Sequence, residues 1–150
     1  MIRNTAVTVC GPLNVNKLGV TYVHEHLMVK PQLPDEYYIP YTLDDEAAST
    51  EETRSFSAAG GETLVEMTPI NVKAYQRIAQ ATGVHVICCT GFHKQLFMPP
   101  WFGDKTDGEL YDILMNEVTN GLDDTEIHPG VIKLGTSFEE VTAAEKRSIE

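Results

Sequence analysis

Residues 84–91, VHVICCTG, decide the fold class of this chain. The run is nearly continuous in apolar residues, as expected of a β-strand that is covered on both faces. The segment before it, VKAYQRIAQATG over residues 72–83, has apolar residues at helical spacing, and Gly83 closes that helix as a C-cap. Asn71 stands where the helix cap is expected. A helix that leads directly into a strand buried on both faces indicates α/β structure.

The same alternation of strand and helix extends in both directions from this strand. The first helix should be capped by Thr42 or Asp44, and the helix after the 84–91 strand by Thr106 or Asp107. The other expected elements are a hairpin over 5–19 around a Gly-Pro-Asn turn, a buried first strand over 19–27, strands over 62–69 and 129–135, helices from Leu43 to Gly60-Gly61, over 106–122 and within 137–150, and loops over 31–42 and 91–105.

Four β-then-α units in a row predict a parallel sheet with helices outside it. We expect the amino-terminal half of a (β/α)8 TIM barrel, after a short N-terminal hairpin, because a whole barrel usually needs about 250 residues. Residues 1–150 would then be half of a single barrel domain, truncated in the fourth helix, whether as a fragment or as a half that another chain completes. A complete four-stranded α/β domain is the alternative.

The composition of the chain argues against several classes of partner and location. Acidic residues outnumber basic ones 22 to 11, for a formal net charge of −11, which argues against nucleic acid and against an anionic membrane surface as partners. No apolar stretch reaches the length of a membrane span, and the first residues lack the apolar core of a signal peptide. Cys10, Cys88 and Cys89 form a poor disulfide framework and favour reduced thiols, so a cytoplasmic location is expected.

The sharpest chemical feature is His24-Glu25-His26 at the end of the first strand. Side chains at i and i+2 of a strand point to the same face, so both imidazoles can reach one metal ion. Neutral imidazole nitrogen suits zinc and neighbouring first-row metals. Glu25 points to the opposite face, where it is expected to be a structural hydrogen-bond partner. An isolated HxH pair also occurs in ordinary packing, but barrel active sites lie at this end of the strands.

Lys133 lies between Ile132 and Leu134 in the expected fourth strand. A buried, unpaired lysine is costly, so a buried ion pair or a side chain that reaches the rim is one explanation. The other is a lysine with a lowered pKa that acts as a base or as a modified metal ligand. Glu66, near the end of the second strand, is a candidate to hydrogen-bond a metal ligand if it faces the barrel.

Four segments carry a resemblance to a known family: GVTYVHEHL, GGETLVEMTP, VHVICCTGFH and PGVIKLGTSFEEVTAAEKRSIE, in this order and spacing. The chain resembles the phosphotriesterase family of the amidohydrolase superfamily, of the phosphotriesterase-like lactonase type. The resemblance covers nearly the whole chain, and HEHL together with a strand lysine followed by Gly-Thr is specific to it. It implies a (β/α)8 barrel with a binuclear metal centre, commonly zinc.

The resemblance also assigns residues to the centre. His24 and His26 would bind the more buried of two divalent metal ions, and Lys133, carboxylated by CO2 to a carbamate, would bridge the two. A hydroxide held between the ions attacks the substrate. Two further histidines and a metal-binding aspartate, which also handles the proton, come from later strands and lie beyond residue 150. Three ligands do not complete a centre for two ions, so this chain alone is expected to bind metal weakly and to be inactive.

Departures from the family lie close to the expected site. Tyr22 and Val23 precede the first histidine, where members often carry leucine and a small hydroxyl residue. His93 stands at about the place where many lactone-hydrolysing members have a tyrosine; it is either a substrate contact or a solvated loop residue. Lys94 is a candidate for an anionic substrate group such as a phosphate. Trp101 belongs to an apolar loop cluster that either lines the pocket mouth or packs over the barrel rim.

These observations predict a metal-dependent hydrolase of ester-like bonds, with a lactone as the small-molecule substrate. Phosphotriester hydrolysis is the alternative within the same chemistry, because the same hydroxide attacks either centre. A non-catalytic barrel-derived binding or assembly module is the alternative from another class. The enzyme needs the carboxyl-terminal half of the barrel as a partner, and a homodimer is an arrangement that the resemblance allows.

Overall fold

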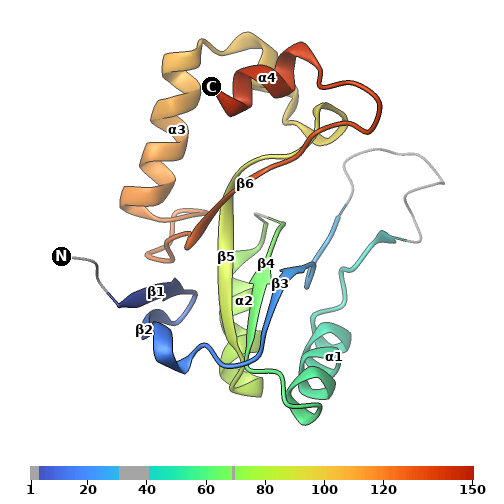
Figure 1. Ribbon diagram of the computed structural model, residues 1–150, viewed down its shortest axis with the longest axis vertical. Helices are drawn as coiled ribbons and strands as arrows, with labels where there is room; N and C mark the ends of the chain where they lie inside the picture. Colours follow the sequence, from blue (N-terminus) through green and yellow to red (C-terminus); the bar gives the residue numbers. More distant parts are fainter. Residues whose placement is uncertain (1–3, 31–40, 69) are drawn as a thin grey trace.

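The computed structural model describes residues 4–30, 41–68 and 70–150, and shows a parallel sheet with helices around it (Figure 1). Most of the expected loop over 31–42, and Pro69, lie outside the described residues. In chain order, with η for a 3-10 helix, the elements are β1 (Thr5–Thr8), β2 (Gly11–Asn14), η1 (Val15–Lys17), β3 (Thr21–Glu25), α1 (Glu46–Ala58), β4 (Thr63–Glu66), α2 (Val72–Thr82), β5 (His85–Phe92), η3 (Gln95–Phe97), η4 (Pro100–Asp104), α3 (Asp107–Asn120), β6 (Val131–Leu134) and α4 (Ala143–Ile149). Across these ranges, no helix is long and apolar enough to cross a membrane.

The central sheet has four parallel strands in the order β3-β4-β5-β6, so each strand lies beside the next one along the chain. An α-helix follows each of these four strands along the chain, and this βα pair is the repeating unit of a barrel. The expected amino-terminal half of a (β/α)8 barrel is therefore confirmed. The carboxyl ends of all four strands lie at one edge of the sheet, where a barrel carries its active site.

The strands differ in how much of them is covered. All four residues of β4 are buried, whereas Tyr22 on β3 is 56% exposed and Ile132 on β6 is 66% exposed. Among the described residues, β3 pairs only with β4 and β6 only with β5, so these two are the edge strands. The prediction of a buried first strand is wrong for this chain, because a strand with one neighbour in the sheet leaves much of its surface uncovered.

The main core lies between α2 and the sheet. Tyr75 and Ile78 of α2 are fully buried, and they belong to one cluster with Val86 of β5. Burial of an aliphatic side chain such as that of Ile78 contributes about 1.5–3 kcal/mol. A smaller cluster, which includes Phe92 and Phe102, joins the end of β5 to η4 and α3. These two clusters hold β5 between them and so fix the strand from which the loop at 93–105 departs.

The amino-terminal hairpin forms, but its turn is not where the sequence placed it. β1 and β2 pair in register with Thr8 opposite Gly11, so the turn is Val9-Cys10 and Gly11 lies in a strand. The Thr8 hydroxyl accepts from the Cys10 N–H and donates to the Gly11 carbonyl, which closes the turn with side-chain bonds. Gly11, at φ +105°, has a conformation that favours glycine and is found beside such turns. The expected Gly-Pro-Asn turn is therefore wrong.

Helix starts were predicted with mixed success. Asp45, and neither Thr42 nor Asp44, caps α1 by accepting from the N–H groups of two residues of its first turn. Asn71 precedes α2 but is in the left-handed conformation with φ 51°, and its side chain makes no capping hydrogen bond. Thr106 caps α3 as one of the two expected residues, in a capping box with Glu109. The cap at Gly83 is confirmed, with φ 76°.

Candidate metal centre

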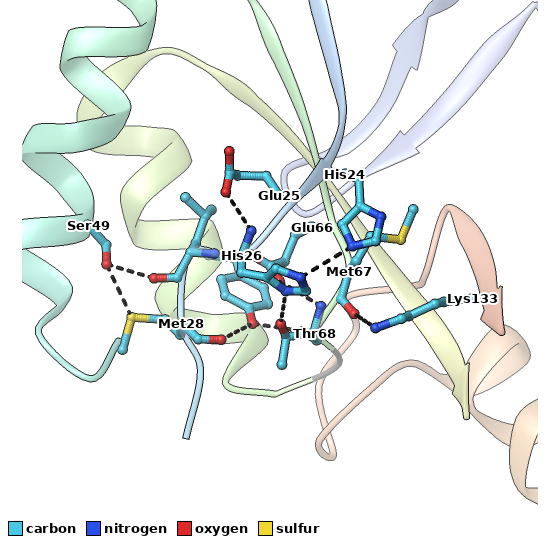
Figure 2. A network of polar contacts seen from close by, with 11 residues as sticks. His24, Glu25, His26, Met28, Ser49, Glu66, Met67, Thr68 and Lys133 are labelled. Atoms are coloured by element: carbon cyan, nitrogen blue, oxygen red, sulfur yellow. Dashed lines mark hydrogen bonds and ion pairs between the residues drawn. The ribbon is translucent and has the colours of Figure 1, made fainter. Parts of the chain in front are cut away.

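His24 and His26 meet at the carboxyl end of β3, as their spacing predicted (Figure 2). The two Nε2 atoms lie 3.3 Å apart, and the ring planes are inclined by 72°. In a tetrahedral zinc site with Zn–N bonds of about 2.0–2.1 Å, two ligand nitrogens lie about 3.4 Å apart. The imidazole pair therefore has the nitrogen separation that one chelated divalent ion requires.

His26 is held by a second contact on the other side of its ring. Its Nδ1 lies 2.6 Å from the Thr68 hydroxyl oxygen, on the residue that follows β4 by two positions. Burial lowers the pKa of His26, and the nearby Lys133 and His24 lower it further. The ring is therefore neutral near pH 7, which is the form that binds metal.

Lys133 of β6 is 9% exposed, and its Nζ donates to the Met67 carbonyl over 2.8 Å (Figure 2). Burial lowers the pKa of this amine. Within the described residues the amine makes no ion pair, so the buried ion pair considered from the sequence does not form there. The structure thus places Lys133 against the end of β4, the same segment whose Thr68 contacts His26.

Glu66, at the end of β4, is fully buried. Its carboxyl accepts from the Leu27 N–H and from the Thr68 N–H, the latter over 2.6 Å. Burial raises the pKa of Glu66 to about 7, although these bonds and one from the Thr68 side chain oppose the rise. The carboxyl oxygen Oε1 lies 3.9 Å from Nδ1 of His26, which is too far for a direct hydrogen bond. Glu25 accepts from the His26 N–H over 2.9 Å, and this confirms its structural role.

The loop after β5 brings His93 towards the same centre. Burial lowers the pKa of His93 to about 4, and Lys133 and His26 are among the charges that contribute. Its Nδ1 accepts from the Lys94 N–H over 2.9 Å, and its ring lies edge-on to Phe97. The Lys94 amine lies 5.2 Å from the centre of the Phe97 ring. The His93 ring is half-buried and so is not a fully solvated loop residue, and its role as a substrate contact stays a prediction.

Trp101 packs against the end of β5. It belongs to η4, is 40% exposed, and packs edge-on against Phe92 with ring centres 6.3 Å apart. That contact corresponds to packing over the barrel rim. In the part of the chain that the structure describes, no three His, Cys, Asp or Glu side chains lie close enough to form a metal site by themselves. The candidate donors are therefore the two imidazoles together with the amine of Lys133.

Sequence reasoning missed Thr68 and the Met67 carbonyl. Both contact candidate ligands, and both belong to the two residues that follow β4. A signal was present, because Thr68 is two residues beyond Glu66, at the carboxyl end of the second expected strand. Barrel sites gather at these strand ends, so a hydroxyl there was a candidate on position alone.

Glu145 of α4 ties together the loops that follow β5 and β6. The carboxylate is fully buried and accepts from the Gln95 N–H, the Ser137 hydroxyl and the Thr142 N–H over 2.7–2.9 Å. Burial raises the pKa of Glu145, but the hydrogen bonds outweigh it and lower the pKa to about 2. One carboxylate therefore fixes the position of the loop that carries His93 relative to α4.

A carboxyl with a lowered pKa stabilises the fold only while it is ionised. The contribution of Glu145 should be complete above about pH 4.5, its unfolded value, and should be lost as the pH falls towards 2. We expect Glu145→Gln to destabilise the chain at pH 7 and to flatten the dependence of the free energy of unfolding on pH over this window. Urea titrations from pH 2.5 to 7 measure the free energy of unfolding and its dependence on pH. Glu150→Gln is the control. Equal pH profiles for Glu145→Gln and the wild type would contradict the assignment.

Four βα units with polar side chains gathered at the carboxyl ends of their strands define half of an enzyme-type barrel. Residues 4–150 match the model of the phosphotriesterase family. The chain belongs to this family.

Named relatives extend the comparison. The chain is 30% identical to the phospho-furanose lactonase of Mycoplasmopsis synoviae, over 100% of this chain and 48% of the relative. It is 30% identical to the N-acetyltaurine hydrolase of Danio rerio, over 99% of this chain and 52% of the relative. A crystal structure of an amidohydrolase from Mycoplasma synoviae superimposes with a TM-score of 0.90 at 28% identity, over 99% of this chain and 48% of that one. The chain thus spans about half the length of the curated relatives that it matches.

Proposed function

We propose that this chain supplies the amino-terminal part of the metal centre of a hydrolase that cleaves ester-like bonds. The observation that carries the proposal is the pair of Nε2 atoms of His24 and His26, 3.3 Å apart at the carboxyl end of β3. Two divalent ions, with zinc as the first candidate, would lower the pKa of a shared water and polarise the scissile carbonyl. The remaining ligands and the proton-handling aspartate would come from the carboxyl-terminal half of the barrel.

Lys133 is proposed as the bridging ligand after reaction with CO2. The neutral amine adds to the carbon of CO2 and releases one proton, which leaves an anionic carbamate with two oxygen donors. Burial, which lowers the pKa of the amine, favours the neutral form that this reaction needs. In the absence of the carbamate, the amine donates to the Met67 carbonyl and is held at the end of β6.

A lactone is the proposed substrate. One relative is named a phospho-furanose lactonase, and Lys94 has the charge that a phosphate on such a substrate would need. His93, neutral at pH 7 because burial lowers its pKa to about 4, accepts from the Lys94 N–H at Nδ1 and would donate a hydrogen bond from Nε2–H to the ring oxygen. Trp101, which packs at the rim, would limit access from that side. Phosphotriester hydrolysis is the second candidate within this chemistry.

The alternative from another class is a binding or assembly module without activity. A panel of lactones with and without a phosphate, a phosphotriester and N-acetyltaurine separates the candidates. It should be run on the complete barrel, that is, this chain with the carboxyl-terminal half, after loading with zinc. We expect phosphorylated lactones to be hydrolysed fastest, and Lys94→Ala to raise KM for them without raising KM for plain lactones. A zinc-loaded barrel that hydrolyses nothing would support the non-catalytic module.

The proposed cytoplasmic location rests on the free thiols of Cys88 and Cys89.

A further inference from the structure

Two side chains, of Glu66 at the end of β4 and of Thr68 just after it, lie behind the imidazole pair (Figure 2). The Thr68 hydroxyl lies 2.6 Å from Nδ1 of His26, and the Thr68 N–H donates to the buried carboxyl of Glu66 over 2.6 Å. Hydrogen bonding by the Thr68 side chain is also among the influences that lower the pKa of Glu66. Glu66 itself is 3.9 Å from Nδ1 of His26, so the hydroxyl stands between the carboxyl and the ring. A series of polar contacts therefore runs from Glu66 through Thr68 to the ring of His26. The other nitrogen of that ring, Nε2, faces His24.

The positions of the hydrogen atoms in this series of contacts can be assigned. A threonine hydroxyl has one hydrogen to donate and lone pairs to accept. As a carboxylate, Glu66 has only acceptors; it accepts from the Leu27 and Thr68 N–H groups, and a bond with the Thr68 hydroxyl must have the hydroxyl as donor. The Thr68 oxygen then accepts from Nδ1–H of His26. With the proton on Nδ1, the lone pair of the neutral ring is on Nε2, where a metal ion would bind.

We infer that Thr68 is a positioning residue of the candidate metal centre: its hydroxyl, oriented by Glu66, fixes His26 as the Nδ1–H tautomer and directs Nε2 towards the metal. The inference rests on the proposed function for the identity of the ligand, but not for the tautomer. Metal-binding histidines commonly donate their other N–H to a carboxylate or a carbonyl, and here a hydroxyl is interposed between ring and carboxylate.

Thr68 is itself held from several directions. Its N–H donates to Glu66 over 2.6 Å, and its carbonyl accepts from the Tyr75 hydroxyl over 2.8 Å. Tyr75 is fully buried in α2, which anchors the segment to the core. The neighbouring Met67 carbonyl accepts from Lys133. The segment from Glu66 to Thr68 therefore contacts two of the three candidate ligands and sets their positions relative to one another.

The test compares Thr68→Val, which keeps the shape and removes the hydroxyl, with Thr68→Ser, which keeps the hydroxyl. Thr63→Val is the matched control, because Thr63 is a buried residue of β4, the strand that Thr68 follows, and its hydroxyl donates to the Leu18 carbonyl. The first readout is the nitrogen-15 spectrum of the histidine rings in the metal-free chain at pH 8. We expect His26 to be the Nδ1–H tautomer in the wild type, Thr68→Ser and Thr63→Val, and to shift to Nε2–H in Thr68→Val.

The second readout is the affinity for Zn2+, measured by competition with a chromophoric chelator, together with the absorption spectrum of the Co2+ form. Thr68→Val should weaken binding by about 10- to 100-fold, the usual effect of losing such a partner, while Thr68→Ser stays within about 3-fold of the wild type. Circular dichroism checks that each variant is folded.

The two readouts separate the possible failures. An Nε2–H tautomer in the wild type, or an unchanged tautomer in Thr68→Val, overturns the inference. An equal loss of Zn2+ affinity in Thr68→Ser and Thr68→Val also overturns the inference, because the shape of threonine and not its hydroxyl would then matter. An Nδ1–H tautomer that depends on the hydroxyl, in a protein that binds no metal even as a complete barrel, would support the positioning role and refute the proposed function.

Discussion

Replacing His24 or His26 with asparagine is expected to lower the affinity of the chain for Zn2+ by on the order of 100-fold or more. Losing a residue that merely supports a ligand costs about 10- to 100-fold, and loss of a ligand itself should reach or pass the upper end of that range. The two Nε2 atoms lie 3.3 Å apart and act as one chelating pair. Either substitution therefore reduces a two-point attachment to a single bond, and the double variant should bind little more weakly than either single one.

The measurement is a competition titration with a chromophoric chelator at pH 7.5, with the metal-free chain as starting material. His85→Asn is the matched control, because His85 begins β5 at the opposite end of the sheet and pairs with Thr63. This control should leave the affinity unchanged. If His24→Asn and His85→Asn have the same effect, the imidazole pair is not the primary site and the proposed function loses the observation that carries it.

The fold of this chain could be predicted largely from local patterns. The continuous apolar run at 84–91 marked a strand covered on both faces, and β5 is the strand held between the two core clusters. Periodicity also located α2 and its end at Gly83. The errors occurred where the hydrogen bonds of a single side chain determine the backbone conformation. The hairpin turn lies at Val9-Cys10 because the Thr8 hydroxyl closes it, and a composition-based reading favours the glycine and proline that follow.

The candidate site was predictable to the extent that it depends on spacing within one strand. The i, i+2 relation of His24 and His26 was sufficient to place both rings on one side of β3. The contacts of Lys133 with Met67 and of His26 with Thr68 join residues 66 and 42 positions apart. They depend on the register between neighbouring strands and on the local conformation after Glu66. A single sequence contains no direct measure of either, so Thr68 could be found only in the structure.

Gly91→Ala should be among the most destabilising single substitutions in this chain, with a loss of about 3 kcal/mol in the free energy of unfolding. Gly91 lies in β5 opposite Lys133 and has φ +110°, a conformation that disfavours any side chain. A Cβ atom at this position would lie 2.1 Å from the Lys133 carbonyl oxygen. Because that oxygen belongs to the backbone of β6, the strand must move away, and the amine of Lys133 must move with it from the Met67 carbonyl.

Two other glycines separate the contributions of backbone strain and steric overlap. Gly83→Ala meets the strain alone, because Gly83 has φ +76° and open space around it, and should cost about 1 kcal/mol. Gly108→Ala meets neither, in the first turn of α3, and should stabilise the chain by up to about 1 kcal/mol. Urea titrations of the three variants give the order. If Gly91→Ala costs no more than Gly83→Ala, the close approach of β5 and β6 is not a constraint on Lys133. A cost near 3 kcal/mol for Gly91→Ala alone would instead mean that a glycine is required where β5 approaches the backbone of Lys133 on β6.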